Sequence, residues 1–421
     1  MIVTLPQRRN VELAVTAPPS KSYTHRALIA AALAKGTSTI VHPLIADDTT
    51  LTIAALLKLG VPVTADTREV RVVGCDGRLP CPPGTTLDLD NSGTTLRLLA
   101  AAALLADHPV TLTGSARMQE RPIGPLAHTL NGLGGMVVFA KKEGYPPLTI
   151  GGRLLGGNAT IDGSASSQFA SSVLMAAPYA RGPVDLTITG PPASQSYLDI
   201  TAEVMTHFGA TIKREGYRHF VVGNRERYTG RTYAIEGDYS SASYFFALAA
   251  ICGGTVTVTG LKPLSVQGDR LFLSALEMMG CSVTYGNDRV TVTHEGPLAG
   301  VTIDMSSAPD TVQTLCMVAA VAKSPTIITG ISHLKYKESD RVAVTADRLR
   351  LLGGKVTTES DRIVILPAPL HGGTIDPAGD HRTAMSFAVL GLGIGGVRIT
   401  CADCTNKSFP GFWELLSKVM A

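Results

Sequence analysis

One kind of segment recurs six times along the 421 residues of this chain, and this repetition limits the folds that the chain can adopt. In each copy an extended stretch ends at an acidic residue or a proline, a turn rich in small residues follows, and an Ala-rich apolar run comes next. Such anchors recur roughly every 70 residues, a period typical of a repeated structural unit; they are Pro18, Asp90, Asp162, Glu236, Asp304 and Asp376. The spacing predicts six copies of one unit.

The second half of each copy predicts the other elements of the unit. Residues 256–260 and 326–330 are runs of β-branched residues, and each is followed by an amphipathic segment. Alternating Val and Thr at 290–293 have the period of a strand, whereas Leu51 and Ala55 have the spacing of a helix face. The unit is therefore predicted to run βαβαββ, which makes the chain an α/β protein.

The last copy predicts how the chain is divided into domains. It starts near Gly396 and has one helix, at 412–420, without the two closing strands. Extended stretches at 2–5 and 11–15, joined by a turn, are predicted to form the missing hairpin. We therefore expect two domains of three repeats each: residues 1–16 with 237–421, closed by the N-terminal hairpin, and residues 17–236.

Apolar patterning indicates which helices are buried. The segments at 98–106 and 244–252 are apolar nearly all round, so they should lie inside their domains, while the second helix of each unit should lie outside. The longest apolar runs are about nine residues, too short to cross a bilayer. Arg8 and Arg9 precede no continuous apolar stretch, so no signal peptide is predicted and a cytoplasmic location is expected.

Cysteines and charge exclude several classes of protein. Seven scattered cysteines, an odd number, argue against a disulfide framework. Cys401 and Cys404 form a lone CxxC without a second ligand pair, so a zinc or redox site is the less favoured interpretation, and no metal or cofactor is expected. A net charge of +3, without a basic stripe, argues against nucleic acid as a partner. The expected form is a monomer that binds small molecules.

Cations lie at predicted helix starts, where main-chain N–H groups and the helix dipole favour negative charge. In Pro-Pro-Ser-Lys-Ser-Tyr-Thr-His-Arg (18–26), Lys21 and Ser22 fall at the helix entry and Arg26 about one turn later. A capped helix with surface charges would explain this cluster equally well. Asn-Ser-Gly-Thr-Thr-Leu-Arg (91–97) is a glycine-containing turn that permits close approach of the backbone to a ligand.

Further clusters follow the same pattern. Arg121 directly precedes a proline, which biases it away from helical geometry, so its side chain can project from the turn. Residues 162–168 carry hydroxyl and amide groups, although N-capping would explain a single serine there. Lys337 and Arg341 share one helical face, which in isolation is typical of a solvated surface. Together the clusters predict a pocket for a substrate with several negative groups.

Seven ordered motifs between residues 18 and 413 resemble one family. They are Pro-Ser-Lys-Ser-x3-Arg (19–26), Asn-Ser-Gly-Thr-x2-Arg (91–97), Glu-Arg-Pro-Ile (120–123), Ser-Ser-Gln-Phe (166–169), Lys-Glu-Ser-Asp-Arg (337–341), Asp-His-Arg (380–382) and Thr-x-Lys-Ser-Phe-Pro (405–410). This set resembles the 5-enolpyruvylshikimate-3-phosphate synthases, a family of enolpyruvyl transferases. The resemblance implies a two-domain inverted α/β barrel with three repeats per domain and an active site in the cleft between the domains.

The resemblance also implies a reaction. The enolpyruvyl group of phosphoenolpyruvate would pass to the 5-hydroxyl of shikimate 3-phosphate, with release of phosphate, by addition and elimination through a tetrahedral intermediate. This step belongs to the shikimate pathway of aromatic amino acid biosynthesis. Two phosphates and two carboxylates in one cleft would account for the cations. Because cations from both domains would surround these anions, the cleft is expected to be open when empty and to close when shikimate 3-phosphate binds.

Site residues are implied by the family's motifs. Those expected to bind shikimate 3-phosphate are Lys21, Ser22, Arg26, Ser166, Ser167, Gln168, Ser194, Tyr197, Asp310, His333 and Lys337. Those expected to bind phosphoenolpyruvate are Lys21, Asn91, Gly93, Arg121, Gln168, Arg341, Arg382 and Lys407.

The reaction needs two sites of proton transfer, one at the 5-hydroxyl and one at C3 of the enolpyruvyl group. The resemblance assigns Asp310 as the base near the hydroxyl and Glu338 as the group that exchanges a proton with C3. Lys21 and Lys407 would stabilise developing charge, and His381 would assist the departure of phosphate. From the residues alone, Asp310 could equally be the N-cap of a helix at 311–323.

The chain departs from the family's pattern at two places. His333-Leu-Lys335 stands where Asn-x-Arg is common, which weakens the prediction of polar contacts to the phosphorylated sugar there, and Pro19 stands where glycine is frequent. Neither change affects a proposed proton carrier.

Three other functions compete with this interpretation. An enolpyruvyl transferase acting on UDP-N-acetylglucosamine would need a nucleophilic cysteine in the loop at 117–121, which has none. A non-catalytic anion-binding repeat protein would not need Asp310, Glu338 and Lys21 together. A regulatory protein that binds a partner would need an exposed apolar stripe, which the sequence does not show.

Overall fold

The computed structural model describes residues 1–420, which form two compact units. The central unit is Pro19–Ile235, and the terminal unit combines Met1–Pro18 with the chain from Glu236 onward. Each unit has its own hydrophobic core. The chain thus crosses between the units twice, directly after Pro18 and directly before Glu236.

The central unit contains six α-helices and three sheets of four strands. Its helices are α1 (Lys21–Leu33), α2 (Asp47–Lys58), α3 (Gly93–Ala102), α4 (Gly124–Gly132), α5 (Gln168–Ala176) and α6 (Ser196–Phe208). Its strands are β3 (Lys35–Val41), β4 (Val63–Ala65), β5 (Glu69–Cys75), β6 (Thr86–Asp88), β7 (Val110–Thr113), β8 (Gly135–Phe139), β9 (Leu148–Gly152), β10 (Gly157–Asp162), β11 (Val184–Thr189), β12 (Ile212–Glu215), β13 (His219–Val222) and β14 (Thr232–Ala234). The sheet orders are β14-β3-β5-β4, β6-β7-β9-β8 and β10-β11-β13-β12.

The terminal unit repeats this plan. Its helices are α7 (Tyr239–Cys252), α8 (Leu271–Met278), α9 (Val312–Ala320), α10 (Arg341–Leu351), α11 (His381–Ile394) and α12 (Phe412–Ser417). Its strands are β1 (Val3–Leu5), β2 (Val11–Thr16), β15 (Gly254–Thr259), β16 (Ser282–Tyr285), β17 (Arg289–His294), β18 (Thr302–Asp304), β19 (Thr326–Thr329), β20 (Lys355–Thr358), β21 (Arg362–Leu366), β22 (Gly373–Ile375) and β23 (Val397–Ile399). The sheet orders are β2-β15-β17-β16, β18-β19-β21-β20 and β1-β23-β22.

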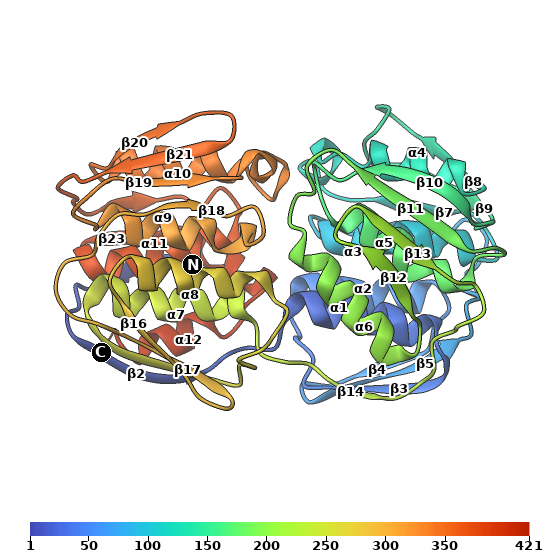
Figure 1. Ribbon diagram of the computed structural model, residues 1–421, viewed down its shortest axis with the longest axis horizontal. Coiled ribbons are helices and arrows are strands. Elements are labelled where there is room, and N and C mark those ends of the chain that lie inside the picture. Colours follow the sequence, from blue (N-terminus) through green and yellow to red (C-terminus); the bar gives the residue numbers. More distant parts are fainter. Residues whose placement is uncertain (421) are drawn as a thin grey trace. The chain divides into compact units, whose positions relative to one another are not determined.

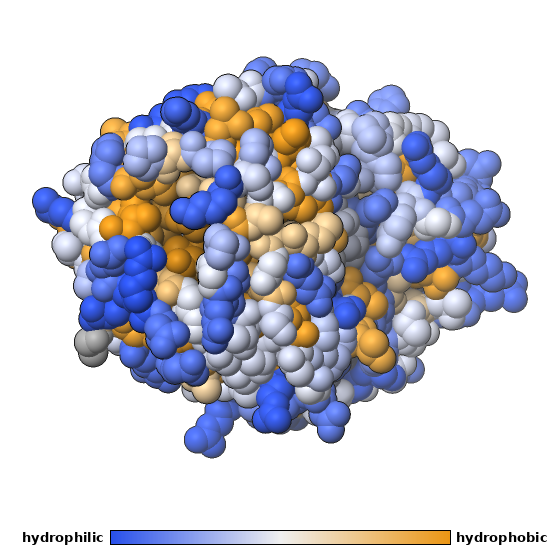
Figure 2. All heavy atoms as spheres, turned by 60° about the vertical axis from the view of Figure 1, so that its left-hand side comes forward, coloured by the Kyte–Doolittle hydropathy of each residue, from blue (hydrophilic) through white to orange (hydrophobic). Residues whose placement is uncertain are grey.

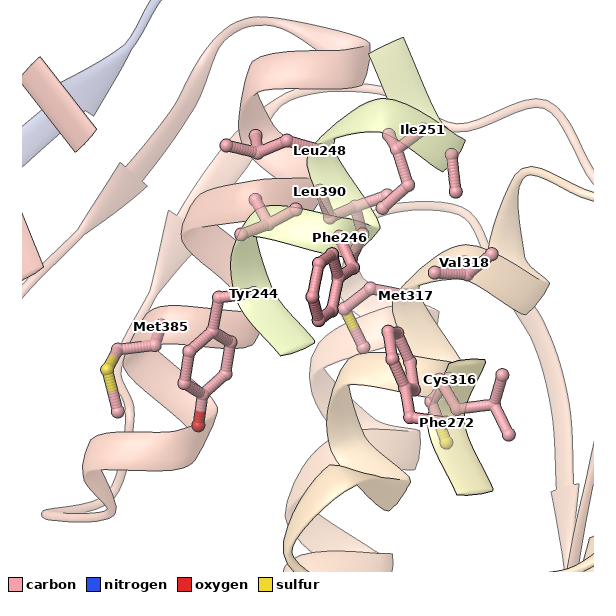
Figure 3. Close-up of a cluster of buried hydrophobic side chains, with 14 of the residues drawn as sticks. Tyr244, Phe246, Leu248, Ile251, Phe272, Cys316, Met317, Val318, Met385 and Leu390 are labelled. Atoms are coloured by element: carbon pink, nitrogen blue, oxygen red, sulfur yellow. The ribbon is translucent and has the colours of Figure 1, made fainter. Parts of the chain in front are cut away.

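The first helix of every repeat lies inside its unit, as the apolar pattern predicts. All residues of α7 are buried, and so are all but the last residue of α11. Figure 1 shows α7, α9 and α11 side by side within the terminal unit, with sheets on the outside. Their facing side chains, such as Phe246, Met317 and Leu390, form the core in Figure 3. Each buried side chain of this size contributes about 1.5–3 kcal/mol, so this central helix layer holds the unit together.

The repeats explain the sheets. Within a repeat the first two strands are parallel, as in β6–β7 and β18–β19, because a helix carries the chain back across the sheet between them. The following strands pair antiparallel, as β8 pairs with β9. The predicted α/β class with βαβαββ repeats is thereby confirmed.

The predicted N-terminal hairpin is wrong. β1 pairs antiparallel with β23 and completes the last sheet, whereas β2 pairs in parallel with β15 in another sheet. The intervening turn does not fold back, because its backbone is bonded to two helix ends: the Arg8 amide donates to the Leu392 carbonyl, and the Asn10 amide donates to the Cys252 carbonyl. The segment therefore steps from one sheet to the next.

The strand before each crossing stays in the unit that the chain then leaves. β2, which precedes Pro18, stays in the terminal unit beside β15, and β14, which precedes Glu236, stays in the central unit beside β3. Both pairs are parallel. β2 and β14 therefore occupy, in their sheets, the position that β6 occupies beside β7 in another sheet. Among residues 1–420, no helix has the length and apolar character needed to cross a membrane.

Candidate active site

Polar residues of the central unit gather at the starts of its inner helices. Lys21 is the first residue of α1, and its ammonium lies 2.9 Å from a carboxylate oxygen of Asp48, at the start of α2. Asp48 is almost fully buried, so it fixes the ammonium at the helix start. The Asp48 main-chain carbonyl in turn accepts from Thr95 of α3, at 3.3 Å. Three helix starts are thereby connected.

Arg26 lies one turn further into α1 and is fully buried. Its guanidinium donates to the Thr201 hydroxyl at 2.8 Å, to the Ser22 carbonyl at 3.1 Å and to the Tyr197 carbonyl at 3.3 Å, and it lies 6.0 Å from the centroid of the Tyr197 ring. Burial lowers the pKa of Arg26 to about 10, which leaves it charged at neutral pH. Three predicted site residues, Ser22, Arg26 and Tyr197, are therefore in direct contact.

Arg121 projects from the turn before α4, as its position before a proline predicts. Its guanidinium donates to both the carbonyl and the side-chain oxygen of Asn91, at 3.0 and 3.1 Å. Gly93 begins α3 beneath it, and a Cβ there would come within 2.5 Å of an Arg121 nitrogen. Glycine is therefore required for this close approach.

Gln168 begins α5 and connects it to α3. Its amide donates to the Thr94 hydroxyl at 3.0 Å, its Oε1 accepts from Arg97 at 3.0 Å, and its backbone amide donates to the Ser166 hydroxyl at 3.2 Å. Ser166, Ser167 and Ser194 are buried, and Ser194 has a φ of +55°, a left-handed conformation rarely adopted by residues other than glycine.

The terminal unit holds a buried cluster of acids and arginines. Arg341, the first residue of α10, donates to Asp310 at 2.9 Å, to Glu338 at 2.7 Å and to Asp380 at 2.9 Å. Burial alone would lower the pKa of this guanidinium, but Asp380, Glu338 and Asp310 raise it well above its usual value. Its charge is thus fixed and shared among three carboxylates.

Arg382 of α11 shares Asp310 with Arg341. It donates to the second Asp310 oxygen at 2.6 Å and to the Tyr244 hydroxyl at 3.3 Å. The alternative N-cap role of Asp310 is wrong, because Thr311 occupies the N-cap position of α9 and the Asp310 side chain is bonded to the two guanidiniums instead. The two Asp310 oxygens are thus oriented toward Arg341 and Arg382.

Asp380 supports both arginines. One of its oxygens accepts from Arg341 and from the Ser339 hydroxyl, and the other caps α11 by accepting from the Arg382 amide. Burial alone would raise the pKa of Asp380, but the Arg341 guanidinium lowers it below its usual value. Asp380 is therefore a permanent anion beneath the cluster.

Other predicted residues belong to the terminal unit, and two of them, His381 and His333, lie near this cluster. His381 is the first residue of α11 and fully buried, while Lys407 ends the 3-10 helix Ala402–Lys407 and is half-buried. His333 is buried, and burial together with nearby Lys337 lowers its pKa to about 3. His333 is therefore neutral at physiological pH and can serve as a hydrogen-bonding group but not as a cation.

Sequence reasoning missed several supporting residues. Asp48 holds Lys21, Thr94 holds Gln168, and Asp380 holds Arg341, yet none was assigned a role. Gln313 of α9 was also missed: its buried amide donates to Thr345 of α10 at 3.0 Å and to Thr383 of α11 at 2.8 Å. Only Asp380 carried a local signal, as an acid directly before a helix; the others depend on pairing between distant segments.

Asp269 is a further buried acid near the cluster. Burial, together with the negative charge of Asp310, raises its pKa to about 7. Among residues 1–420, no group of three or more His, Cys, Asp or Glu side chains is arranged to hold a metal ion. The geometry thus provides fixed cations, fixed carboxylates and helix starts in each unit, a chemistry suited to binding anions and moving protons.

Known proteins resemble this chain over its full length. The sequence pattern of the family described as EPSP synthase (3-phosphoshikimate 1-carboxyvinyltransferase) matches residues 5–416. A relative from Methanoregula boonei named 3-phosphoshikimate 1-carboxyvinyltransferase is 78% identical over 420 residues and covers 100% of both chains. One of the same name from Methanoculleus marisnigri is 62% identical over 416 residues and covers 99% of both.

Solved structures agree with the sequence relatives. A structure of EPSP synthase from Acinetobacter baumannii superimposes with a TM-score of 0.83 at 28% identity, covering 100% of this chain and 98% of that one. The fold is accordingly the two-domain enolpyruvyl transferase fold implied by the motifs. The chain belongs to the EPSP synthase (3-phosphoshikimate 1-carboxyvinyltransferase) family.

Proposed function

We propose that this protein transfers the enolpyruvyl group of phosphoenolpyruvate to the 5-hydroxyl of shikimate 3-phosphate and releases phosphate. Family membership supports the reaction class. The observation that carries the chemical assignment is that one buried guanidinium, Arg341, holds both Asp310 and Glu338, at 2.9 and 2.7 Å. The reaction needs two groups that exchange protons, and these carboxylates are fixed side by side.

Asp310 takes the proton of the 5-hydroxyl as the oxygen attacks C2 of phosphoenolpyruvate, and C3 gains a proton from the protonated carboxyl group of Glu338. The resulting tetrahedral intermediate then returns a proton from C3 to Glu338, the C2–O bond to phosphate breaks, and the departing phosphate takes the proton held by Asp310. Arg341 and Arg382 both donate to Asp310, which fixes the orientation of its carboxylate for this step. Lys21 and Lys407 stabilise the charge that develops on the phosphate, and His381 assists its departure.

Phosphoenolpyruvate is bound by cations of both units in this proposal. Arg341, Arg382 and Lys407 come from the terminal unit, while Lys21, Asn91, Gly93, Arg121 and Gln168 come from the central unit. Support comes from the Arg121 guanidinium, which is held over the start of α3, where the main-chain amides of a helix end add to its attraction for an anion.

Shikimate 3-phosphate is bound chiefly by the central unit. Ser22, Arg26, Ser166, Ser167, Ser194 and Tyr197 supply hydroxyl groups and a buried cation, with Lys21 and Gln168 between the two substrates. Asp310, His333 and Lys337 of the terminal unit complete its site. We therefore propose that the active site lies in a cleft between the two units and closes when this substrate binds.

The test is the reaction itself. The protein is incubated with both substrates, and phosphate release and the new enol ether are followed by phosphorus and proton NMR. Equal amounts of phosphate and enol ether are expected only when both substrates are present. Hydrolysis of phosphoenolpyruvate alone, or equal activity with UDP-N-acetylglucosamine in place of shikimate 3-phosphate, would contradict the proposal.

We further propose that the protein acts as a monomer in the cytoplasm. One chain supplies every residue assigned to the two substrates, so no second copy is needed. All seven cysteines are free thiols, which is typical of a reducing compartment. Light scattering after gel filtration should give the mass of one chain, 44.1 kDa; a mass twice as large would rule out the monomer.

A further inference from the structure

A cavity lies in the terminal unit, at the ends of the inner helices opposite the acid–arginine cluster. It has a volume of about 700 Å³, within the usual range of sites for small molecules. Its walls include the last residues of α7 and α11 and the residues directly after α9, represented by Ile251, Ile394 and Val321. Figure 2, which brings the side of this unit forward, shows a hollow with hydrophobic walls and hydrophilic side chains at its edge.

Comparison with the central unit shows that this space is not an inevitable result of the repeat. There Tyr179, which follows α5, covers Gly77 so closely that a Cβ on Gly77 would lie 1.9 Å from its ring. At the same distance after the repeat's anchor residue, the terminal unit has Gly393, which has no side chain. Gly296 takes the place of Gly77, and a Cβ there would have no atom within 4 Å. The Ile251 side chain occupies the space beside Gly393, where a Cβ would lie 2.2 Å from it, so the open space of the terminal unit lies over Gly296.

The charges around the cavity favour one class of ligand. Arg9 and Lys323 line it and are exposed, and their side chains have no hydrogen-bond or ion-pair partner among the residues that the structure describes. Among residues 1–420, no aspartate or glutamate lines the cavity. The other lining residues are largely Ala, Pro, Leu, Ile and Val, among them Leu298, and their side chains share the wall with polar atoms. Two unpaired cations beside an apolar surface suit a ligand with one anionic end and one apolar end.

The helix ends determine which way such a ligand would lie. The last carbonyl groups of an α-helix carry partial negative charge, and three helices end at the floor of this cavity. A carboxylate would be repelled from the floor and attracted to Arg9 and Lys323, whereas a ring would contact Ile251, Val321 and Ile394. Both effects give the same orientation.

We propose that this cavity binds a small carboxylate with an aromatic or similarly bulky apolar body, the body inward and the carboxylate between Arg9 and Lys323. The site is separate from the substrate residues, because it lies at the opposite ends of α7, α9 and α11, helices about 13–21 Å long at 1.5 Å per residue. This binding goes beyond the enolpyruvyl transfer proposed above and does not depend on it.

The test uses three probes with the full-length protein in isothermal titration calorimetry at low salt. 2-Naphthoate carries both features, 2-naphthylmethanol lacks the charge, and acetate lacks the apolar body. Saturable binding of 2-naphthoate is expected, with at least about tenfold weaker binding of the other two and a loss of affinity as salt screens the cations. Equal affinity for the neutral probe, or no saturable binding of 2-naphthoate, would overturn the proposal.

Variants locate the bound probe. The double variant Arg9→Gln and Lys323→Gln should weaken 2-naphthoate at least tenfold. Arg289→Gln with Arg362→Gln removes the same charge from the first residues of β17 and β21, at the ends away from the cavity, and should not. Val321→Phe places a ring against the apolar wall of the cavity and should weaken binding at least tenfold while charges stay unchanged. Naphthoate affinity that survives both Val321→Phe and the loss of the two cations would place the probe elsewhere. Excess shikimate 3-phosphate should leave the affinity unchanged; competition between the two would assign naphthoate to the substrate site and contradict the proposal.

Discussion

At the scale of single residues, the acid–arginine cluster consists of buried charges that are held by partners of opposite sign. Arg341 is 2% exposed and would be strongly unfavourable alone, but it donates to three carboxylates. The planar guanidinium can do this because its nitrogens point in different directions, which a lysine ammonium on a flexible stem does not reproduce. The same residue therefore binds and orients the two acids assigned to proton transfer.

His333 gives a prediction about pH. Burial, with Lys337 nearby, lowers its pKa in the folded protein to about 3, from 6.5 as the usual value. The unfolded chain therefore binds a proton that the folded protein does not, between about pH 6.5 and pH 3. His333 thus contributes stability that is complete above pH 6.5 and is lost as the pH falls toward 3, at a rate of up to about 1.4 kcal/mol per pH unit.

Urea unfolding of His333→Asn, measured from pH 8 to pH 4, checks this. The free energy of unfolding should fall less steeply with acidification in the variant than in the unchanged protein. His371→Asn, a change at an exposed histidine, serves as the control and should keep the original slope. Parallel curves for His333→Asn and the unchanged protein would show that His333 is not buried in its neutral form.

At the scale of elements, helix starts position many of the proposed site residues. Lys21, Gly93 and Gln168 begin α1, α3 and α5, and Arg341 and His381 begin α10 and α11. The sequence predicts these positions because strand and helix periods alternate regularly and each cluster falls at the same point of the repeat. It does not predict the partners Asp48 and Thr94, or that β1 and β2 separate, because such pairing joins segments far apart in the chain.

Gln313 holds three of these elements together. Its amide donates to Thr345 and Thr383, which crosslinks α9, α10 and α11 beneath Arg341 and Arg382. Gln313→Met keeps the approximate volume but removes both hydrogen bonds, so the free energy of unfolding should fall by about 1–3 kcal/mol. Gln119→Met, in the 3-10 helix Met118–Glu120 of the central unit, is the control: it also removes two hydrogen bonds, but at a partly exposed site, where their loss should cost less. Unchanged urea midpoints for Gln313→Met would show that the crosslink adds nothing to stability.

Gly237 lies directly after the second crossing between units. A Cβ at this position would come within 2.4 Å of the Gly260 carbonyl oxygen and 3.0 Å of the Ala17 side chain, so Gly237→Ala must shift the backbone where both crossings meet. Such overpacking costs about 1–3 kcal/mol. Gly411→Ala, where a Cβ meets no atom within 4 Å, is the matched control. Equal thermal midpoints for the two variants would contradict this packing.

At the scale of the whole molecule, six copies of one repeat form two units, and each unit has helix starts that carry residues proposed to act on the substrates. The repeat period predicts the α/β class and the number of repeats, and the motifs predict the family. Neither the repeat period nor the motifs can predict that β2 pairs with β15, because more than half of the chain separates these two strands. In the proposed reaction, residues of both units act on the same pair of substrates.

Turnover of two single variants, one in each unit, tests this claim most directly. Phosphate release with both substrates is measured for Lys21→Met of the central unit and Glu338→Gln of the terminal unit, with folding checked by circular dichroism. Lys35→Met and Glu359→Gln, exposed changes in the same units, are the controls. Each site variant should lose turnover by about two to four orders of magnitude while the controls keep it. Near-normal release by either folded site variant would mean that the reaction does not draw on both units.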